Sequence, residues 1–234
     1  MNKFVYAGDK FEIDIKGVKH VLSIELDSDS EDPRSWDNLS KMYCWHRNYS
    51  LGDQHSFNRI REALVDIIGE CVPGDKINEV MSVTGSKVLT GQEVDKLLIE
   101  ALKDYVCIKY LYLYDHSGIS ISTSDFKDPW DSGIVGIVYL TKETILKNIA
   151  YADEVSWYEV ASKIIEEEVD TYDQWLKGEV YCFLLETVEE CPHCNQEVRE
   201  SIDSMGGFFG NNILTNGMLE YLPEEFHNLF KEEE

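Results

Sequence analysis

Aspartate and histidine side chains able to do chemistry gather in two short connections, Asp115-His116-Ser117-Gly118 and residues 125–131. Paired carboxylates can hold a divalent ion, and an imidazole can transfer a proton. The first connection cannot be a catalytic triad, because three adjacent residues of a tight turn cannot point at one another in the required geometry. The residue types favour the alternative that these aspartates bond the backbone of their own turns.

A second chemical group lies upstream, where an aromatic and a cationic side chain are close in sequence. The ring of Trp45 could stack on a nucleobase, and Arg47 could hold a phosphate. The alternative for Trp45 is core packing, which is more frequent for large aromatic residues. With the two connections, these side chains make up a predicted site for a nucleotide or a divalent metal ion. Its residues are Trp45, Arg47, Asp115, His116, Asp128, Trp130 and Asp131.

The third motif is a CxxC pair, Cys191 and Cys194. A redox site of the thioredoxin type needs a thiol of low pKa, whereas the acidic residues that flank this pair are expected to raise its pKa. A structural zinc ion needs four ligands, which Cys182 or His227 could complete only through folding. The sequence therefore favours an unliganded loop and leaves zinc open as a metal for Cys191 and Cys194. It indicates no other cofactor.

Hydrophobic periodicity predicts the elements that must position these groups. Strands are expected at 107–114, 119–123 and 134–140, and the last is apolar enough to be covered on both faces. Further strands are expected in a hairpin at 10–16 and 18–26 and at 179–186, and the segment 39–46 is expected to form a short buried strand or a turn of helix. A loop carrying the CxxC pair and Gly206-Gly207 follows, and a short helical piece is expected near 218–222.

Helices are predicted at 57–71, 90–104, 141–149 and 156–178. Ser56, Thr90, Thr141 and Ser156 are the expected N-caps, with Glu93 and Glu159 completing capping boxes, and Gly178 is the expected C-terminal stop. The sequence therefore predicts an α+β fold. In that prediction residues 1–234 form a single acidic domain, helices flank a central, mostly antiparallel sheet, and residues 231–234 form a frayed tail.

Charge restricts the classes of function. The chain has 45 acidic and 21 basic residues, a net charge of −24, and residues 151–234 contain 21 of the acidic and 4 of the basic residues. Such a surface repels nucleic acid and anionic membranes and attracts basic proteins. No apolar run has the length of a membrane helix, and six scattered cysteines are typical of reduced thiols. We therefore expect a cytoplasmic protein without direct nucleic-acid or membrane binding.

The long helix predicted at 156–178 arranges several acidic side chains in space. Helical spacing places several carboxylates on its outward face, where they form a stripe that can meet a cationic partner. The alternative is a solvated helix face. The partner-binding residues predicted from this stripe are Glu159, Glu166, Glu167, Glu168, Asp170 and Asp173.

Several longer motifs of the sequence resemble motifs in a family of acidic hypothetical proteins of phages and prophages. They are Trp36-Asp37-Asn38-Leu39, Cys44-Trp45-His46-Arg47, Tyr114-Asp115-His116-Ser117-Gly118-Ile119, Pro129-Trp130-Asp131-Ser132-Gly133 and Gly206-Gly207-Phe208-Phe209-Gly210. The resemblance implies a phage or mobile-element context and a location in the cytoplasm of the host bacterium. It implies no activity.

Charge and context together predict a binding protein rather than an enzyme. The first hypothesis is an anti-defence protein, of the anti-CRISPR or antirestriction kind, whose acidic surface mimics DNA. Such a protein would occupy the groove of a basic, nucleic-acid-binding host protein and inhibit it. The alternative is the nucleotide- or metal-binding site on the turns, and a third hypothesis is a zinc-stabilised module. The sequence leaves a homodimer open.

Overall fold

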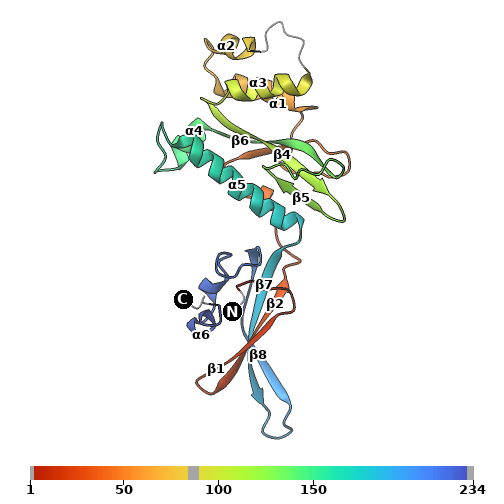
Figure 1. The fold of residues 1–234 in the computed structure, drawn as a ribbon. Helices are drawn as coiled ribbons and strands as arrows, with labels where there is room; N and C mark the ends of the chain where they lie inside the picture. The colour runs from red at the N-terminus through yellow and green to blue at the C-terminus, as the bar shows by residue number, and fades with distance from the viewer. Residues whose placement is uncertain (1–2, 84–89, 231–234) are drawn as a thin grey trace. The chain divides into compact units, whose positions relative to one another are not determined.

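A computed structural model describes residues 3–83 and 90–230, so the tail predicted at 231–234 lies outside the described residues. The expected α+β class is confirmed, with antiparallel strands and helices beside them (Figure 1). The sequence predicted one central sheet, whereas the structure contains two four-stranded sheets. The chain divides into two compact units: unit 1 is Met1–Pro33 with Gln174–Glu234, and unit 2 is Arg34–Asp173.

Unit 2 contains the three central strands of the prediction. Its sheet has the order β3-β6-β4-β5, and each neighbouring pair is antiparallel. The strands are β3 (Lys41–Cys44), β4 (Val106–Asp115), β5 (Ile119–Ser122) and β6 (Ser132–Thr141). Residues 135–140 of β6 are buried on both faces, as expected. At Gly136 an added Cβ would lie 2.1 Å from the carbonyl oxygen of Tyr43, so only glycine permits this close pairing of β3 with β6.

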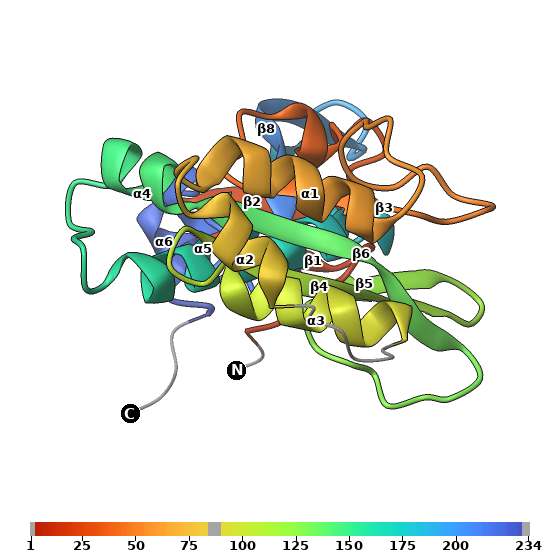
Figure 2. The same cartoon turned by 90° about the horizontal axis from the view of Figure 1, so that it is seen from above.

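Helices cover both faces of this sheet (Figures 1 and 2). The helices on one face are α1 (Ile60–Cys71), α2 (Ile77–Ser82) and α3 (Gly91–Ala101). They pack through Leu64, Ile67 and Leu98 against Ile108 and Ile137 of the strands. The short 3₁₀ turn η1 (Pro33–Ser35), α4 (Lys142–Asn148) and α5 (Trp157–Leu176) complete the elements of this part of the chain.

The predicted N-caps of three of these helices have mixed outcomes. The capping box of Thr90 with Glu93 and the cap from Thr141 to the backbone of Thr144 are both confirmed. Ser56 is not a cap, because α1 begins at Ile60. The N-terminal turn of α1 is instead fixed by Asn58, whose backbone and side-chain N–H groups donate to the carboxylate of Glu62.

The two ends of the long helix α5 are stabilised by different hydrogen bonds. Its N-terminus does not use the predicted box of Ser156 with Glu159, because the hydroxyl and backbone N–H of Ser156 both donate to Asp153. Its C-terminus confirms the prediction for Gly178, which has a φ of 69°. The N–H groups of Gly178 and Glu179 bond the carbonyls of Trp175 and Gln174, which closes the helix in a Schellman motif.

Unit 1 contains the second sheet, in the order β1-β2-β7-β8. The strands are β1 (Lys10–Ile15), β2 (Val18–Leu26), β7 (Val180–Glu190) and β8 (Glu197–Phe209). The hairpin around Gly17 and the strand after Gly178 are confirmed. The loop predicted at Gly206-Gly207 is wrong, because both residues lie within β8, where the pairing with β7 shifts at a bulge.

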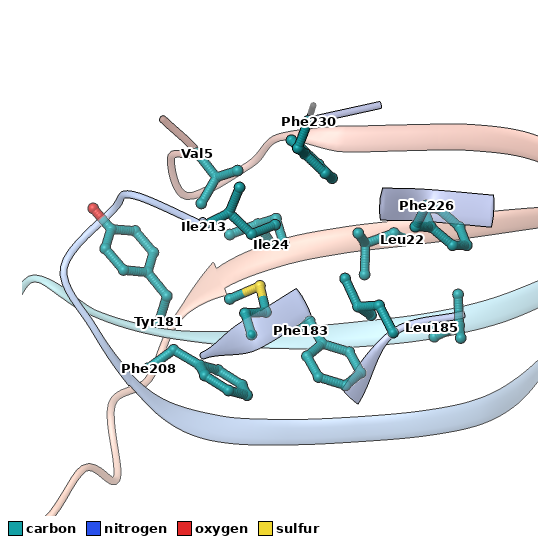
Figure 3. Packing of buried hydrophobic residues seen from close by; sticks show 12 residues of the cluster. Val5, Leu22, Ile24, Tyr181, Phe183, Leu185, Phe208, Ile213, Phe226 and Phe230 are labelled. Atoms are coloured by element: carbon teal, nitrogen blue, oxygen red, sulfur yellow. The ribbon is translucent and has the colours of Figure 1, made fainter. Parts of the chain in front are cut away.

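The core of unit 1 lies between this sheet and the C-terminal segment (Figure 3). Leu22 is opposite Leu185 and Ile24 opposite Phe183 across the β2–β7 pair. The C-terminal elements, η2 (Met218–Tyr221) and α6 (Glu224–His227), add Met218, Phe226 and Phe230 to the same cluster. Within the described ranges, no helix has both the length and the apolar content needed to cross a membrane.

Candidate functional site

A surface cavity of about 310 Å³ lies at one end of the sheet of unit 2. It brings together four residues of the site predicted from the sequence, which come from three separate segments. They are Trp45, Asp115, Trp130 and Asp131. Leu113, Gly133 and Val135 of the central strands also line the cavity. The structure therefore confirms that the two aspartate-rich connections and the segment after β3 meet.

Backbone hydrogen bonds hold these segments beside one another. The N–H of Trp45 donates to the carbonyl of Val135 at 2.7 Å, which extends the β3–β6 pairing by one step. The N–H of Asp115 donates to the carbonyl of Asp131 at 2.9 Å, so the two connections are joined directly. The cavity is thus built on strand ends, which are rigid supports for side chains.

Asp128 has a supporting role and does not line the cavity. One of its carboxylate oxygens accepts the backbone N–H groups of Trp130 and Asp131, each at 2.9 Å. These two bonds hold the pKa of Asp128 below its usual range. This is the turn chemistry that the residue types favoured. Its consequence is the presentation of Trp130, whose side chain is 91% exposed.

The remaining polar groups of the site form short hydrogen bonds among themselves. His116 Nδ1 lies 2.9 Å from Asp131 Oδ2, so the ring donates to this carboxylate from the rim. The hydroxyl of Tyr49 donates to Asp115 Oδ1 at 3.4 Å. Tyr49 also stacks on His46, with ring centroids 4.8 Å apart and an interplanar angle of 15°.

Trp45 is packed against neighbouring residues and also lines the cavity. Its indole N–H donates to the carbonyl of Phe57 at 2.8 Å, and its half-buried ring contacts His55 at 4.7 Å between centroids. The ring also forms one wall of the cavity. Trp45 is therefore a fixed wall, whereas the ring of Trp130 is exposed.

Arg47 lies outside this cavity, in an adjoining one of about 650 Å³ formed by Cys44 and residues 46–55. The two cavities share His46. Backbone N–H groups of Asn48 and Tyr49 both donate to His46 Nδ1 at 3.2 Å, which leaves the ring proton on Nε2. Arg47 is exposed beside this imidazole.

The first cavity is electrostatically negative. Neither Asp115 nor Asp131 forms an ion pair with a lysine or arginine among the residues that the structure describes. Two carboxylates beside an exposed indole ring favour a cationic group, which gains both ion pairing and a cation–π contact.

The structure gives no support to the predicted metal sites. In the described part of the chain, no three His, Cys, Asp or Glu side chains are grouped so that they could hold a metal ion. Cys182 instead points its thiol at the carbonyl of Glu25, and the ring of His227 bonds the carbonyl of Leu222. The CxxC pair occupies the turn between β7 and β8.

The expected pKa of Cys191 is corrected by the geometry of that turn. The pKa is lowered, because the backbone N–H of His193 and the thiol and N–H of Cys194 are placed to donate to Cys191. The expectation of a raised pKa, based on sequence neighbours, was therefore wrong.

The acidic stripe of α5 is also corrected. Glu168, expected to face outward, accepts the N–H groups of Leu39 and Ser40 and pairs with Arg34. Asp173 likewise accepts the hydroxyl of Ser120 and the N–H of Ile121, each at 2.8 Å.

Two further carboxylates of the stripe have cationic neighbours. Glu166 pairs with Lys109, and Glu167 lies 3.7 Å from Lys163. Glu159 and Asp170 are exposed. Glu166, Glu167, Glu168 and Asp173 therefore have partners within unit 2, and the stripe is weaker than the sequence implies.

Six residues that line the cavity were not part of the predicted site: His46, Leu113, Ser132, Gly133, Ile134 and Val135. An isolated glycine inside a strand pattern is a usable signal, because it marks a place where another group approaches the backbone. A Cβ added at Gly133 would meet nothing within 4 Å, so the space above it is open.

Comparison of the chain with protein-family models, curated proteins and solved structures gives no match.

Proposed function

We propose that this protein binds a basic protein by holding one of its arginine side chains in the cavity beside Trp130. The observation that carries the proposal is Trp130, which is 91% exposed and lines the cavity together with Asp115 and Asp131. A planar guanidinium stacks on an indole face and forms paired hydrogen bonds with a carboxylate. An exposed tryptophan with such neighbours has the properties of a binding hot spot.

The net charge supports a basic partner. Unit 1 contains 21 acidic and 7 basic residues, and unit 2 contains 24 acidic and 14 basic residues. Both units are negative, so the field of the whole chain attracts a cationic protein and repels nucleic acid. Binding is then fast at low salt and weakens as the ionic strength rises.

The phage context implied by the resemblance suggests which basic proteins are relevant. A restriction enzyme or CRISPR effector of the host contacts nucleic acid through arginine and lysine, and carboxylates that occupy those groups compete with phosphate. We propose inhibition of such a protein as the biological role. The contact surface shifts from α5 to the cavity, because Glu168 and Asp173 are bonded within unit 2.

The test is the affinity for a fluorescein-labelled hexa-arginine peptide, measured by anisotropy at two salt concentrations. Trp130→Ala and Asp131→Asn are each expected to weaken binding about tenfold, the effect of losing a cation–π contact or a charge-assisted hydrogen bond. Two matched controls remove an exposed aromatic ring and an exposed carboxylate elsewhere, Tyr151→Ala and Glu159→Gln. The proposal fails if the controls weaken binding as much as the cavity variants, because the peptide then responds to overall charge alone.

A nucleotide remains the second candidate ligand. The observation that favours it is Arg47 beside the stacked His46 and Tyr49 in the adjoining cavity. A base stacked on Trp130 could place its phosphate at Arg47. Saturable binding of a mononucleotide that Arg47→Gln abolishes would favour the nucleotide over the arginine side chain.

A further inference from the structure

A third cavity, of about 870 Å³, lies at the end of the sheet of unit 2 that is opposite the cavity beside Trp130. It is lined by the last residues of β6, the first residue of β3, the C-terminal end of α1 and the first turns of α4. Val135 of the cavity beside Trp130 and Tyr139 of this cavity are four positions apart on β6, so about 13 Å of strand separates the two linings. Its volume is within the range of pockets that enclose small organic ligands.

The charge of this cavity differs from that of the protein as a whole. Three lysines, Lys41, Lys142 and Lys147, line it in a chain with more than twice as many acidic as basic residues. Lys142 is fixed by an ion pair with Glu154 at 2.6 Å and lies over the ring of Trp157. Among the described residues, Lys41 and Lys147 have no carboxylate within ion-pair distance.

Lys41 is held close to the cavity by an aromatic ring. Its ammonium lies 6.0 Å from the ring centroid of Tyr139, on the neighbouring strand β6. It also acts on the thiol of Cys71, whose pKa is raised by burial and by Glu70 and Glu143 and lowered by Lys41. With Glu154, these two glutamates balance the three lysines, so the cavity is near neutral within a strongly negative protein.

Apolar and aromatic side chains form part of the walls of the cavity. Leu39, Leu140 and Leu146 line it together with Tyr105 and Tyr139. Apolar walls with a few charged groups bury the body of a ligand and orient its polar head. Two ammonium groups without carboxylate partners select a negative head.

We infer that this cavity binds a small amphipathic anion, with a carboxylate or phosphate head near Lys41 and Lys147 and an apolar body against the leucine and tyrosine walls. This site is separate from the arginine site proposed above. Its lining is near neutral, so an anion meets less repulsion there than over the acidic surface as a whole.

The test uses displacement of the fluorescent anion 8-anilinonaphthalene-1-sulfonate by three amphiphiles of equal chain length. Octanoate and octyl phosphate are expected to displace it, and the stronger of the two identifies the head group. Octylammonium is expected not to displace it, although the overall charge of the protein favours a cation. Displacement by octylammonium at the same concentrations would overturn the inference.

Charge-removing variants locate the binding. Lys41→Gln and Lys147→Gln are each expected to weaken octanoate binding about tenfold. Lys163→Gln is the matched control, because Lys163 is an exposed lysine of α5 outside the cavity. Equal affinity in the two cavity variants and in the wild-type protein would refute the site.

A second readout follows the cavity directly. Cys71 lines the cavity and Cys182 lies in unit 1, so octanoate is expected to slow alkylation of Cys71 and leave Cys182 unchanged. Mass spectrometry of the alkylated peptides measures both rates in one sample. Unchanged alkylation of Cys71 at saturating octanoate would place the anion elsewhere and overturn the inference.

Discussion

Glu168 stabilises unit 2 from the inside, although the sequence places it in an acidic surface stripe. Its carboxylate accepts the backbone N–H of Leu39 at 2.9 Å and that of Ser40 at 3.2 Å, and it also accepts the hydroxyl of Ser40. It pairs with Arg34 at 3.5 Å, and the Arg34 side chain is only 4% exposed. Arg34 in turn forms a two-bond pair with Asp53, so the loop that follows β3 depends on the same network.

The expected cost of Glu168→Ala follows from these partners. Each polar group left buried without a partner costs about 1–3 kcal/mol, and Ser40 is 2% exposed. Arg34 keeps Asp53, so the loss is smaller than that for a fully unpaired buried charge. We expect the free energy of unfolding to fall by about 3–5 kcal/mol, which at a slope of about 2 kcal/mol/M lowers the urea midpoint by about 2 M.

The assay is urea unfolding followed by tryptophan fluorescence. Four of the 5 tryptophans lie in Arg34–Asp173, so this signal reports mainly on unit 2. Glu167→Ala on the same helix is the matched control, because its side chain is 65% exposed and its pair with Lys163 contributes only about 0.3–0.5 kcal/mol. If both variants unfold at the same urea concentration, Glu168 does not stabilise unit 2, and its carboxylate is available at the surface as the sequence predicted.

Three further outcomes are expected. Cys191, whose pKa is lowered, is expected to react with iodoacetamide at neutral pH. Cys44 is buried and its pKa is raised to about 12, so it is expected to react only after unfolding. Mass spectrometry of the alkylated peptides measures the order of reaction. Because the folded pKa of Asp128 is lowered, its support of the loop is complete above its ordinary value and is lost as the pH falls through the lowered one. Amide exchange in residues 130–131 should therefore quicken, relative to intrinsic rates, as the pH falls below the ordinary aspartate value of about 3.9, and Asp128→Asn should abolish that dependence. Gly136→Ala forces a Cβ against the backbone of β3 and is expected to cost about 1–3 kcal/mol in thermal unfolding, with Gly133→Ala near neutral because its surroundings are open.

Elements with local signals were predictable from the sequence. The box of Thr90 with Glu93, the cap at Thr141 and the stop at Gly178 were all confirmed, since each depends on residues a few positions apart. The apolar run of β6 correctly indicated a strand buried on both faces. The two aspartate-rich connections were also located correctly, because Asp, Ser and Gly mark turns between strands.

What the sequence determined by itself is the class of fold, most of its elements and the sign of its charge. Only the tertiary structure decided which strands share a sheet and which carboxylates remain available. Glu168 bonds Leu39, 129 positions away, and Asp131 bonds His116 across two strands. Periodicity shows which side of a helix a residue occupies, but the group opposite it comes from a distant part of the chain. The physical reason is that the pairing of a buried carboxylate depends on chain segments that meet only after folding.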